Sequence, residues 1–353
     1  MNSITACMII KDEGDKIYNT LSSIYYMFDE FVIIDTGSSD NTTDEVNRFI
    51  NDKLSQCNSI KPIICDYFEW VNDFSAARNF SYQKATKDFV TWWDADDRVT
   101  EQLATFFKEF RFNPEYETVD VVHIPTVIQV NEEGVATQYV DNTRVIRRSL
   151  NPHWIYRIHE QLLYDSPKGV VIYSILNRGE YVDAVEDYSK RSHHLNFYAN
   201  LANSDDYEFT MHDLYFFLNE MLVTGDISYW EKYKEVFRRT INKPTKFPGY
   251  PGMIYKRVKE NFKQFYNEQF MEIAEEIFNQ QLKYFGTEPR LCIWIGEYYE
   301  YIKKLPSVAL VWYQIGTKST MLPDYEHYDI ELAQQQSNTH YQKLLKEITD
   351  EHK

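Results

Sequence analysis

The chain has 353 residues, 43% of them hydrophobic, so it is long enough for two domains and can bury a sizeable core. It carries 54 Asp and Glu residues against 37 Lys and Arg residues, and the formal charge of -17 disfavours a binder of nucleic-acid backbones or anionic lipid. There is no signal-peptide pattern, no apolar run near the ~20 residues of a membrane span, and no CxxC pair among the four cysteines. We therefore expect a cytoplasmic protein with no membrane span and no nucleic-acid partner.

The first half of the chain alternates between strand and helix patterns. Short β-branched apolar runs predict strands at 5–11, 31–36, 61–67 and 88–94. Helical patterns lie between and after them, near 15–27, 40–50, 74–86 and 100–110. This alternation predicts βαβ units and a mostly parallel sheet, in which ligands bind beyond the carboxyl ends of the strands. Asp12, Asp35 and Asp94 all fall at those ends.

From about residue 119 the pattern changes to antiparallel strands. Two alternating segments flank "NEEG" at 131–134, which predicts a hairpin turn. A further alternating strand is predicted over 153–164, and a last edge strand over 169–179. We expect this α/β domain to occupy residues 1–186.

Residues 187–353 are predicted to form a separate, all-α domain. Three stretches, beginning at 214, 254 and 291, each combine an aromatic-rich helix, a break and a second amphipathic helix. The breaks are predicted at Gly225-Asp226, Asn267 and Leu305-Pro306. Their starts lie 40 and 37 residues apart, which favours stacked, tetratricopeptide-like helical hairpins. The alternative is an ordinary helical cap whose spacing is coincidental.

The stretch "VTWWDADDRV" at 90–99 places Asp94, Asp96 and Asp97 directly after a predicted buried strand. An unpaired charge at such a place is costly, so these acids need partners. No GxGxxG or Walker sequence is present to bind phosphates in another way. Residues i and i+2 of an extended strand end point the same way, so Asp94 and Asp96 can hold Mg²⁺ or Mn²⁺ together with substrate phosphate oxygens.

Four segments resemble successive blocks of the family 2 glycosyltransferases, which have the GT-A fold. They are "ACMIIKDEGDKIYNTLSSI", "DEFVIIDTGSSDNT", "FEWVNDFSAARNFSYQKATKDFVTWWDADD" and "WIYRIHEQL", and they cover roughly residues 4–165. The resemblance is greatest to a peptide-modifying subgroup that also carries a helical repeat region. It implies a GT-A domain, a nucleotide-sugar donor (commonly a UDP-sugar), a divalent metal ion and inversion at the transferred sugar.

The resemblance also implies a set of donor-binding residues. They are Asp12 and Glu13 near the donor base, Asp35 at the uracil ring, Arg78 near uracil and pyrophosphate, and Asp94 at the ribose and metal. Asp12 stands where the family usually has Asn, which leaves its contact open. The alternative role of Asp35 is to cap the turn that follows it, and that of Arg78 is a salt bridge to Asp73.

Metal and catalytic roles follow from the same resemblance. Asp96 matches the direct metal ligand, and His159 matches a histidine that completes the metal sphere. Inversion needs a base on the acceptor side, for which Glu160 is the first candidate and Asp141 the second. Alternatively, Glu160 merely orients His159, as carboxylates beside metal ligands do. Asp97 replaces a frequent glutamate, so its role is open.

We therefore expect an inverting, Mn²⁺- or Mg²⁺-dependent glycosyltransferase that uses a UDP-sugar and modifies a peptide or protein. Lipid-linked or polysaccharide acceptors are the alternative within the same class. A nucleotidyltransferase would show a Gly-rich basic loop after the first strand, whereas "KDEGDK" has one glycine. The alternative of another class is a non-catalytic helical-repeat adaptor with a relict sugar-nucleotide domain.

Consecutive aromatic residues in the helical domain cannot all face one core, because a helix buries a stripe of only about 100°. The two groups are Tyr215, Phe216 and Phe217, and Tyr298, Tyr299 and Tyr301. We expect some of these rings to pack on the neighbouring hairpin and others to form an interface. A homodimer through the helical domain is the prediction, and contact with the acceptor peptide is the alternative.

Overall fold

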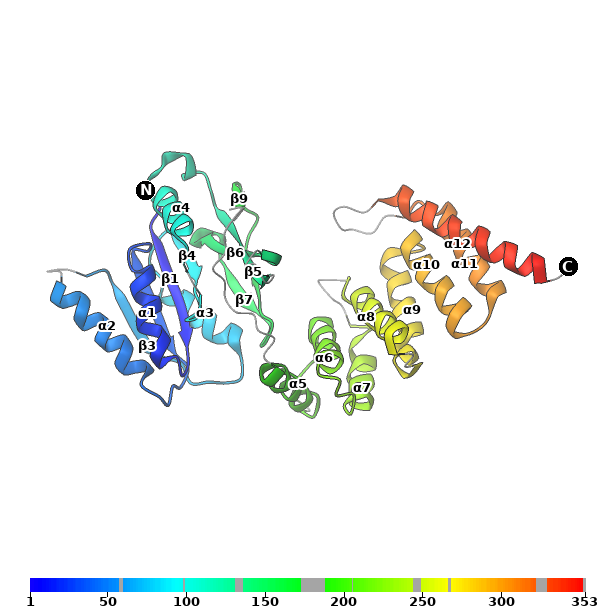
Figure 1. The fold of residues 1–353 in the computed structure, drawn as a ribbon, viewed down its shortest axis with the longest axis horizontal. Helices are drawn as coiled ribbons and strands as arrows, with labels where there is room; N and C mark the ends of the chain where they lie inside the picture. Colours follow the sequence, from blue (N-terminus) through cyan, green and yellow to red (C-terminus); the bar gives the residue numbers. More distant parts are fainter. Residues whose placement is uncertain are drawn as a thin grey trace. The chain divides into compact units, whose positions relative to one another are not determined.

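The computed structural model divides into two compact units, Met1–Asp187 and Tyr188–Lys353, and each is described by itself (Figure 1). The structure describes residues 1–56, 60–97, 99–130, 136–172, 188–204, 206–243, 249–265, 268–321 and 329–351. Within these ranges no helix combines the length and the apolar character that a membrane crossing requires.

The first unit is built on a seven-stranded, mostly parallel sheet in the order β3-β2-β1-β4-β6-β5-β9 (Figure 1). Its strands are β1 Ile4–Ile10, β2 Glu30–Asp35, β3 Ile63–Tyr67, β4 Phe89–Trp92, β5 Val121–Val130, β6 Ala136–Arg147 and β9 Val170–Ile172. The first four are parallel, and β6 pairs antiparallel with both β4 and β5. The predicted edge strand is present over Val170–Ile172, whereas 173–179 and the predicted turn at 131–134 lie outside the described residues.

The strand predicted over 153–164 is wrong as a single element. It is instead a separate two-stranded hairpin, β7 His153–Ile155 and β8 Gln161–Leu163, joined by an irregular loop. Tyr156 and His159 in this loop have φ of 69° and 53°, a left-handed conformation that no extended strand can contain. Hydrophobic alternation continued through the loop and hid this break.

Four helices cover the sheet, and the alternation of side chains along each strand explains how. They are α1 Gly14–Ile24, α2 Thr42–Gln56, α3 Phe74–Lys84 and α4 Glu101–Phe112. On β1, Ala6 and Met8 face the core that α1, α2 and α4 complete, whereas Cys7 faces the core that includes Tyr82 of α3. Both faces of the sheet are thus buried, as expected for parallel strands.

The register of the parallel strands brings their carboxyl ends to one edge. Ile10 of β1 pairs with Asp35 of β2, and Asp35 pairs in turn with Tyr67 of β3. The backbone N–H of Trp93, just past β4, donates to the carbonyl of Cys7 at 3.0 Å. The loops that begin at Lys11, Thr36 and Trp93 therefore leave the sheet at the same edge, which confirms the predicted location of the acids.

The second unit is all-α in its described part, as predicted. Its α-helices are α5 Tyr188–Ala202, α6 Met211–Thr224, α7 Trp230–Thr240, α8 Tyr250–Phe265, α9 Ala274–Phe285, α10 Pro289–Glu297, α11 Pro306–Lys318 and α12 Ile330–Glu351. Two of the predicted breaks have clear causes. Gly225 ends α6 with φ 71°, and Pro306 begins α11, where its missing N–H has no intrahelical partner to lose. Asn267, the third predicted break, lies outside the described residues.

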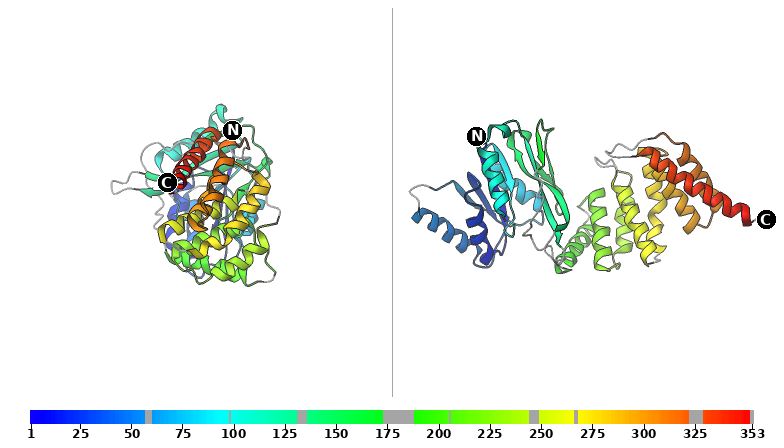
Figure 2. Two further views of the ribbon diagram at one scale, coloured as in Figure 1. Left: turned by 90° about the vertical axis from the view of Figure 1, so that its right-hand side faces the viewer. Right: turned by 45° about the horizontal axis from the view of Figure 1, so that its top comes forward.

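Polar contacts between successive helices of this unit recur at one sequence offset. Each of the following pairs is separated by 38 residues: Asn219–Arg257, Lys234–Glu272, Arg238–Glu276 and Lys259–Glu297. They join α6 to α8, α7 to the region of α9, and α8 to α10, and the right-hand view of Figure 2 shows the helices of this unit in succession from green through yellow to orange. A constant offset is what stacked helical hairpins produce, so these contacts favour the repeat interpretation over a coincidental spacing.

The consecutive aromatic residues divide between neighbouring helices and the surface. The ring of Tyr215 on α6 lies 5.9 Å from the ring of Tyr250 on α8. Tyr298 is buried against Phe278 of α9, whereas Tyr301 is 42% exposed. The packing half of the prediction is therefore met, and the homodimer stays a prediction.

A buried carboxylate fixes the start of β2. Glu30 is only 2% exposed, and it accepts hydrogen bonds from the Thr5 hydroxyl at 2.6 Å, the Thr86 backbone N–H at 2.7 Å and the Thr86 hydroxyl at 2.6 Å. Burial alone would raise the pKa of Glu30, but these hydrogen bonds outweigh it, so the pKa lies below its usual value. Glu30 therefore links β1, β2 and the loop before β4.

We predict that Glu30→Gln lowers the free energy of unfolding by about 1–3 kcal/mol at pH 7, because an acceptor oxygen is replaced by an amide N–H in a buried site. The folded-state pKa is lowered, so this stabilisation is complete above the unfolded pKa and disappears as pH falls through the folded pKa. Urea unfolding at pH 7 and near pH 3.5 measures the loss of unfolding free energy and its dependence on pH. Glu109→Gln, at an exposed position of α4, is the control. An equal loss at the two pH values would contradict this account.

Candidate active site

The acidic loop after β4 turns sharply and sends its side chains in different directions. The backbone N–H of Asp97 donates to the carbonyl of Asp94 at 3.1 Å, which closes the turn. Trp93 is 2% exposed and packs on Phe28 in the core. Trp92 lies on the other face of the strand, where its indole N–H donates to the carbonyl of Thr143 at 2.8 Å.

Two of the three acids are open to a ligand, and the third is not. The side chain of Asp94 is 36% exposed, and Asp96 is exposed. Asp97 is 10% exposed and forms a bidentate ion pair with Arg144, at 2.6 Å and 3.0 Å. Burial raises the pKa of Asp97, and the guanidinium of Arg144 opposes this shift. The charge of Asp97 is therefore neutralised inside the protein.

Arg78 joins the acidic loop to the loop between β7 and β8. Its Nη2 donates to Asp94 at 3.2 Å and its Nε donates to Glu160 at 2.7 Å. The guanidinium lies over the rings of Trp92 and Trp154, 5.1 Å and 5.0 Å from their centroids. The alternative of a salt bridge to Asp73 is not observed, because Asp73 caps α3 by accepting from the Ala76 N–H at 2.9 Å.

The β7–β8 loop holds the predicted base and the predicted metal-binding histidine. The backbone N–H of Phe74 donates to the carbonyl of Arg157 at 2.8 Å, which fixes the loop to the start of α3. Left-handed conformations at Tyr156 and His159 cost energy and are typical of functional loops. Glu160 is 15% exposed and is bonded to Arg78, so in this structure it orients the arginine rather than the histidine.

The loops after β1 and β2 interlock through acidic side chains. Asp12, which has φ 53°, accepts from the Ser39 N–H at 2.7 Å, and this bond holds the pKa of its carboxyl below the usual value. Asp35 Oδ1 accepts from the backbone N–H groups of Gly37 at 3.0 Å and Ser38 at 2.8 Å. The turn-capping alternative for Asp35 is thus observed, and its other oxygen contacts the Thr43 hydroxyl at 3.2 Å.

Gly14 is the only glycine in the turn that follows β1, and it lies close to the turn that follows β2. A Cβ on Gly14 would lie 1.9 Å from the side-chain oxygen of Asn41. Glu13, the residue before it, donates its backbone N–H to the Thr42 hydroxyl at 2.7 Å. The first turn therefore packs directly against the second, and a side chain at position 14 would have to displace Asn41.

The acidic loop suits a hard divalent cation shared with a substrate. No three His, Cys, Asp or Glu side chains converge as a closed cage within the described part of the first unit. Asp94, Asp96 and His159 do not meet in such a cluster, so the role of His159 stays a prediction. Mg²⁺ and Mn²⁺ commonly take one or two carboxylates and complete their sphere with substrate phosphate oxygens and water. The exposed carboxylate Asp96, beside Asp94, fits that pattern.

One candidate base lies outside the described side chains. Asp141 is on β6, opposite Pro125 of β5, but the position of its carboxylate is not described. Sequence reasoning missed Arg144 and Trp154, both of which contact the site. The available signal was an arginine at 144 directly before the apolar pair Val145 and Ile146, since a cation in a buried strand requires an acid as partner.

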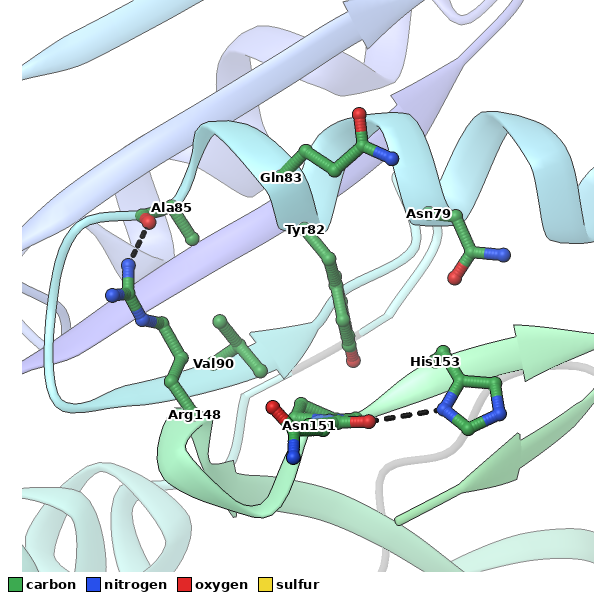
Figure 3. A pocket seen from close by; sticks show the side chains of 9 residues that line it. Asn79, Tyr82, Gln83, Ala85, Val90, Arg148, Asn151 and His153 are labelled. Carbon is green, nitrogen blue, oxygen red and sulfur yellow. Dashed lines mark hydrogen bonds between the residues drawn. The ribbon is translucent and has the colours of Figure 1, made fainter.

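A separate cavity of about 520 Å³ lies against α3 and the end of β6 (Figure 3). It is lined by Asn79, Tyr82, Gln83, Ala85, Val90, Arg148, Asn151, Pro152 and His153. Arg148 donates to the carbonyl of Ala85, and His153 Nδ1 donates to the carbonyl of Asn151 at 3.0 Å. Val90 lies near the amino end of β4, whereas Asp94 follows the carboxyl end, so this cavity is distinct from the acidic site.

Comparison with known proteins agrees with this arrangement. Residues 5–166 match the model of the family described as Glycosyl transferase family 2. The SPbeta prophage-derived glycosyltransferase SunS of Bacillus subtilis is 26% identical over 159 residues, 45% of this chain and 34% of that protein. A TPR repeat-containing protein of Synechococcus elongatus is 30% identical over 115 residues, 33% of this chain and 26% of that protein. The matches therefore span about a third or less of these relatives' length.

Two solved structures are similar at lower identity. The match to S. aureus TarS covers 80% of this chain and 55% of the TarS chain, with 15% identity and a TM-score of 0.42. The second is the mannosyltransferase PcManGT from Pyrobaculum calidifontis in complex with GDP-Man and Mn²⁺. The match covers 80% of this chain and 86% of the PcManGT chain, with 14% identity and a TM-score of 0.35. The match to glycosyl transferase family 2 over residues 5–166 lies entirely within the first unit of the chain.

Proposed function

We propose that the chain transfers a sugar from a UDP-sugar to a side chain of a peptide or protein, with inversion at the sugar and with Mn²⁺ or Mg²⁺ bound. The observation that carries this proposal is the convergence of Asp94, Arg78 and Glu160 at the edge where the acidic loop leaves the sheet. The family match over residues 5–166 supports the glycosyltransferase activity. The acceptor class rests on the resemblance to peptide-modifying members, with lipid-linked and polysaccharide acceptors as the other outcomes of the test.

The net charge of the acidic loop and its ion-pair partners supports a divalent ion there. Asp94, Asp96, Asp97 and Glu160 bring four negative charges, and Arg78 and Arg144 bring two positive charges through three ion-paired contacts. Four minus two leaves two uncompensated negative charges, which one divalent cation balances. Asp96 is the exposed member of the set and would be its direct ligand, with Asp94 beside it. When bound, such a cation neutralises the charge that develops on the leaving diphosphate.

The protein groups then have separate tasks. Arg78 holds Asp94 in place, and its fixed guanidinium contributes positive charge beside the expected diphosphate position. Glu160 takes the proton from the acceptor hydroxyl or thiol as that atom bonds to the anomeric carbon and the bond to the diphosphate breaks. Deprotonation and attack occur on the face opposite the leaving group, which gives inversion. Trp92 and Trp154 shield Arg78 from water and strengthen its interactions.

The proposal is tested by incubating the purified chain with UDP-sugars and GDP-sugars in the presence of Mn²⁺ and by measuring nucleotide release. Release of UDP from at least one UDP-sugar, and its loss with EDTA, is the expected result. Peptide, lipid-linked and polysaccharide acceptors are then added to find which one accelerates release. Absence of release with every donor and acceptor would favour the non-catalytic adaptor.

The metal assignment predicts the behaviour of Asp96→Asn. This substitution keeps the size of the side chain and removes the charge that would hold the cation, so UDP release should fall at least about 100-fold. The thermal midpoint should stay near that of the parent, because Asp96 is exposed. Asp44→Asn, in the exposed first turn of α2, is the matched control. Turnover equal to that of the parent would show that Asp96 does not bind the metal.

The base assignment predicts a different pattern for Glu160→Gln. Transfer should fall by about 10²–10⁴-fold, the usual contribution of a general base, while calorimetric affinity for UDP changes little. Arg78→Lys provides the contrast, since it keeps a cation but loses the simultaneous contacts to Asp94 and Glu160. A collapse of UDP affinity in Glu160→Gln, equal to that in Arg78→Lys, would mean that Glu160 only positions the arginine.

A further inference from the structure

We propose that Asp97 and Arg144 form a positioning pair, which fixes the main chain of the acidic loop and, through Trp92, the guanidinium of Arg78. Asp97 is then a positioning residue and not a metal ligand, although it lies next to Asp96 in the sequence. The structural part of this inference stands on the ion pair itself, and its catalytic consequence rests on the proposed function.

The pair holds the chain on both sides of Trp93. Asp97 Oδ2 accepts from the backbone N–H of Asp94 at 2.9 Å, and Arg144 Nη1 donates to the carbonyl of Trp92 at 3.4 Å. The two side chains bind each other in a bidentate geometry, with exposed fractions of 10% and 7%. A bidentate guanidinium–carboxylate pair fixes orientation as well as distance. The backbone at Asp94 is therefore set from β6, a strand of the rigid sheet.

The pair also extends to Arg78 through one aromatic ring. The guanidinium of Arg144 lies 3.5 Å from the centroid of the Trp92 ring, and that of Arg78 lies 5.1 Å from the same centroid. The ring cannot turn freely, because its N–H donates to the Thr143 carbonyl on β6 at 2.8 Å. Displacement of Arg144 would release the ring from one side and with it a surface against which Arg78 rests.

Stability alone gives a weak reason for such a pair. Replacing a buried ion pair by uncharged groups of similar volume is often neutral or stabilising, whereas removal of one partner leaves an uncompensated buried charge. The double substitution Asp97→Asn/Arg144→Gln removes both charges at once, keeps the size of residue 97 and leaves a shorter polar side chain at residue 144. It therefore separates a positioning role from a purely stabilising one, which the single variants cannot do.

The matched control is the pair Asp120 and Arg147. Arg147 lies on the same strand as Arg144, three residues further on, and its Nε donates to Asp120, just before β5, at 2.7 Å. Arg147 pairs with Phe89 at the amino end of β4, whereas the acidic loop follows the carboxyl end. Asp120→Asn/Arg147→Gln thus removes a comparable ion pair from the same sheet, at the end of β4 opposite to the acidic loop.

The experiment compares the full-length parent, Asp97→Asn/Arg144→Gln and Asp120→Asn/Arg147→Gln by three measurements. These are the thermal midpoint, the NMR signal of the Arg78 Nε–H bonded to Glu160, and UDP release with Mn²⁺. We expect the first double variant to stay folded, to shift or broaden the Arg78 signal, and to lose about 10- to 100-fold in kcat/KM, mainly through KM for the Mn²⁺–donor pair. The control should leave the Arg78 signal and turnover unchanged.

An unchanged Arg78 signal in folded Asp97→Asn/Arg144→Gln would overturn the inference, whatever the activity. So would an equal shift of that signal in the control, because the effect would then be a general loosening of the sheet. If the variant does not fold, Arg144→Lys provides the same NMR comparison with the charge retained. A shifted Arg78 signal in a chain without UDP release would support the positioning pair and contradict the proposed function, so the two failures are distinguishable.

Discussion

The site depends on a buried guanidinium that holds two carboxylates from different parts of the chain. Arg78 is 9% exposed, lies over the rings of Trp92 and Trp154, and contacts Asp94 and Glu160. Carboxylates that are gathered at one edge of a sheet repel one another. Burial increases the energetic cost of this repulsion, because the local dielectric constant is lower than that of water. Internal arginines relieve part of this repulsion and simultaneously fix the geometry. The charge that they leave uncompensated defines what the site can bind.

The two arginines act on the acidic loop from different elements of the fold. Arg78 comes from α3, which is itself fixed by the Asp73 cap, and Arg144 comes from β6. Between them lies Trp92, the last residue of β4. The regular elements therefore supply the rigid groups, whereas the loops supply the exposed carboxylate Asp96 and the strained residues Asp12 and His159. Such a division, with ligand-facing groups on loops and their supports on helices and strands, favours a preorganised site.

The fold could be predicted from the sequence because it depends on local patterns. β-Branched runs marked β1 to β4, and their carboxyl ends located the acidic loop correctly. The pairing of acids with arginines could not be predicted in this way. Arg78 and Glu160 are 82 residues apart, and Asp97 and Arg144 are 47 apart, so neither contact leaves a periodic trace. The same limit explains the missed break at Tyr156, where a left-handed residue interrupts an alternating pattern. In the helical unit, by contrast, repetition at intervals of 40 and 37 residues predicted contacts between successive hairpins, and the structure has such contacts at an offset of 38 residues.

The proposed donor site is tested most directly by Mn²⁺ binding, followed by electron paramagnetic resonance with and without UDP. The exposed acidic loop should hold Mn²⁺ weakly in the free chain, and UDP should raise the affinity by about tenfold or more, because the diphosphate supplies further oxygen ligands. By reciprocity, Mn²⁺ should raise the affinity for UDP by the same factor. Equal Mn²⁺ affinity with and without UDP, in a chain that binds both, would contradict a cation shared between the acidic loop and the donor diphosphate.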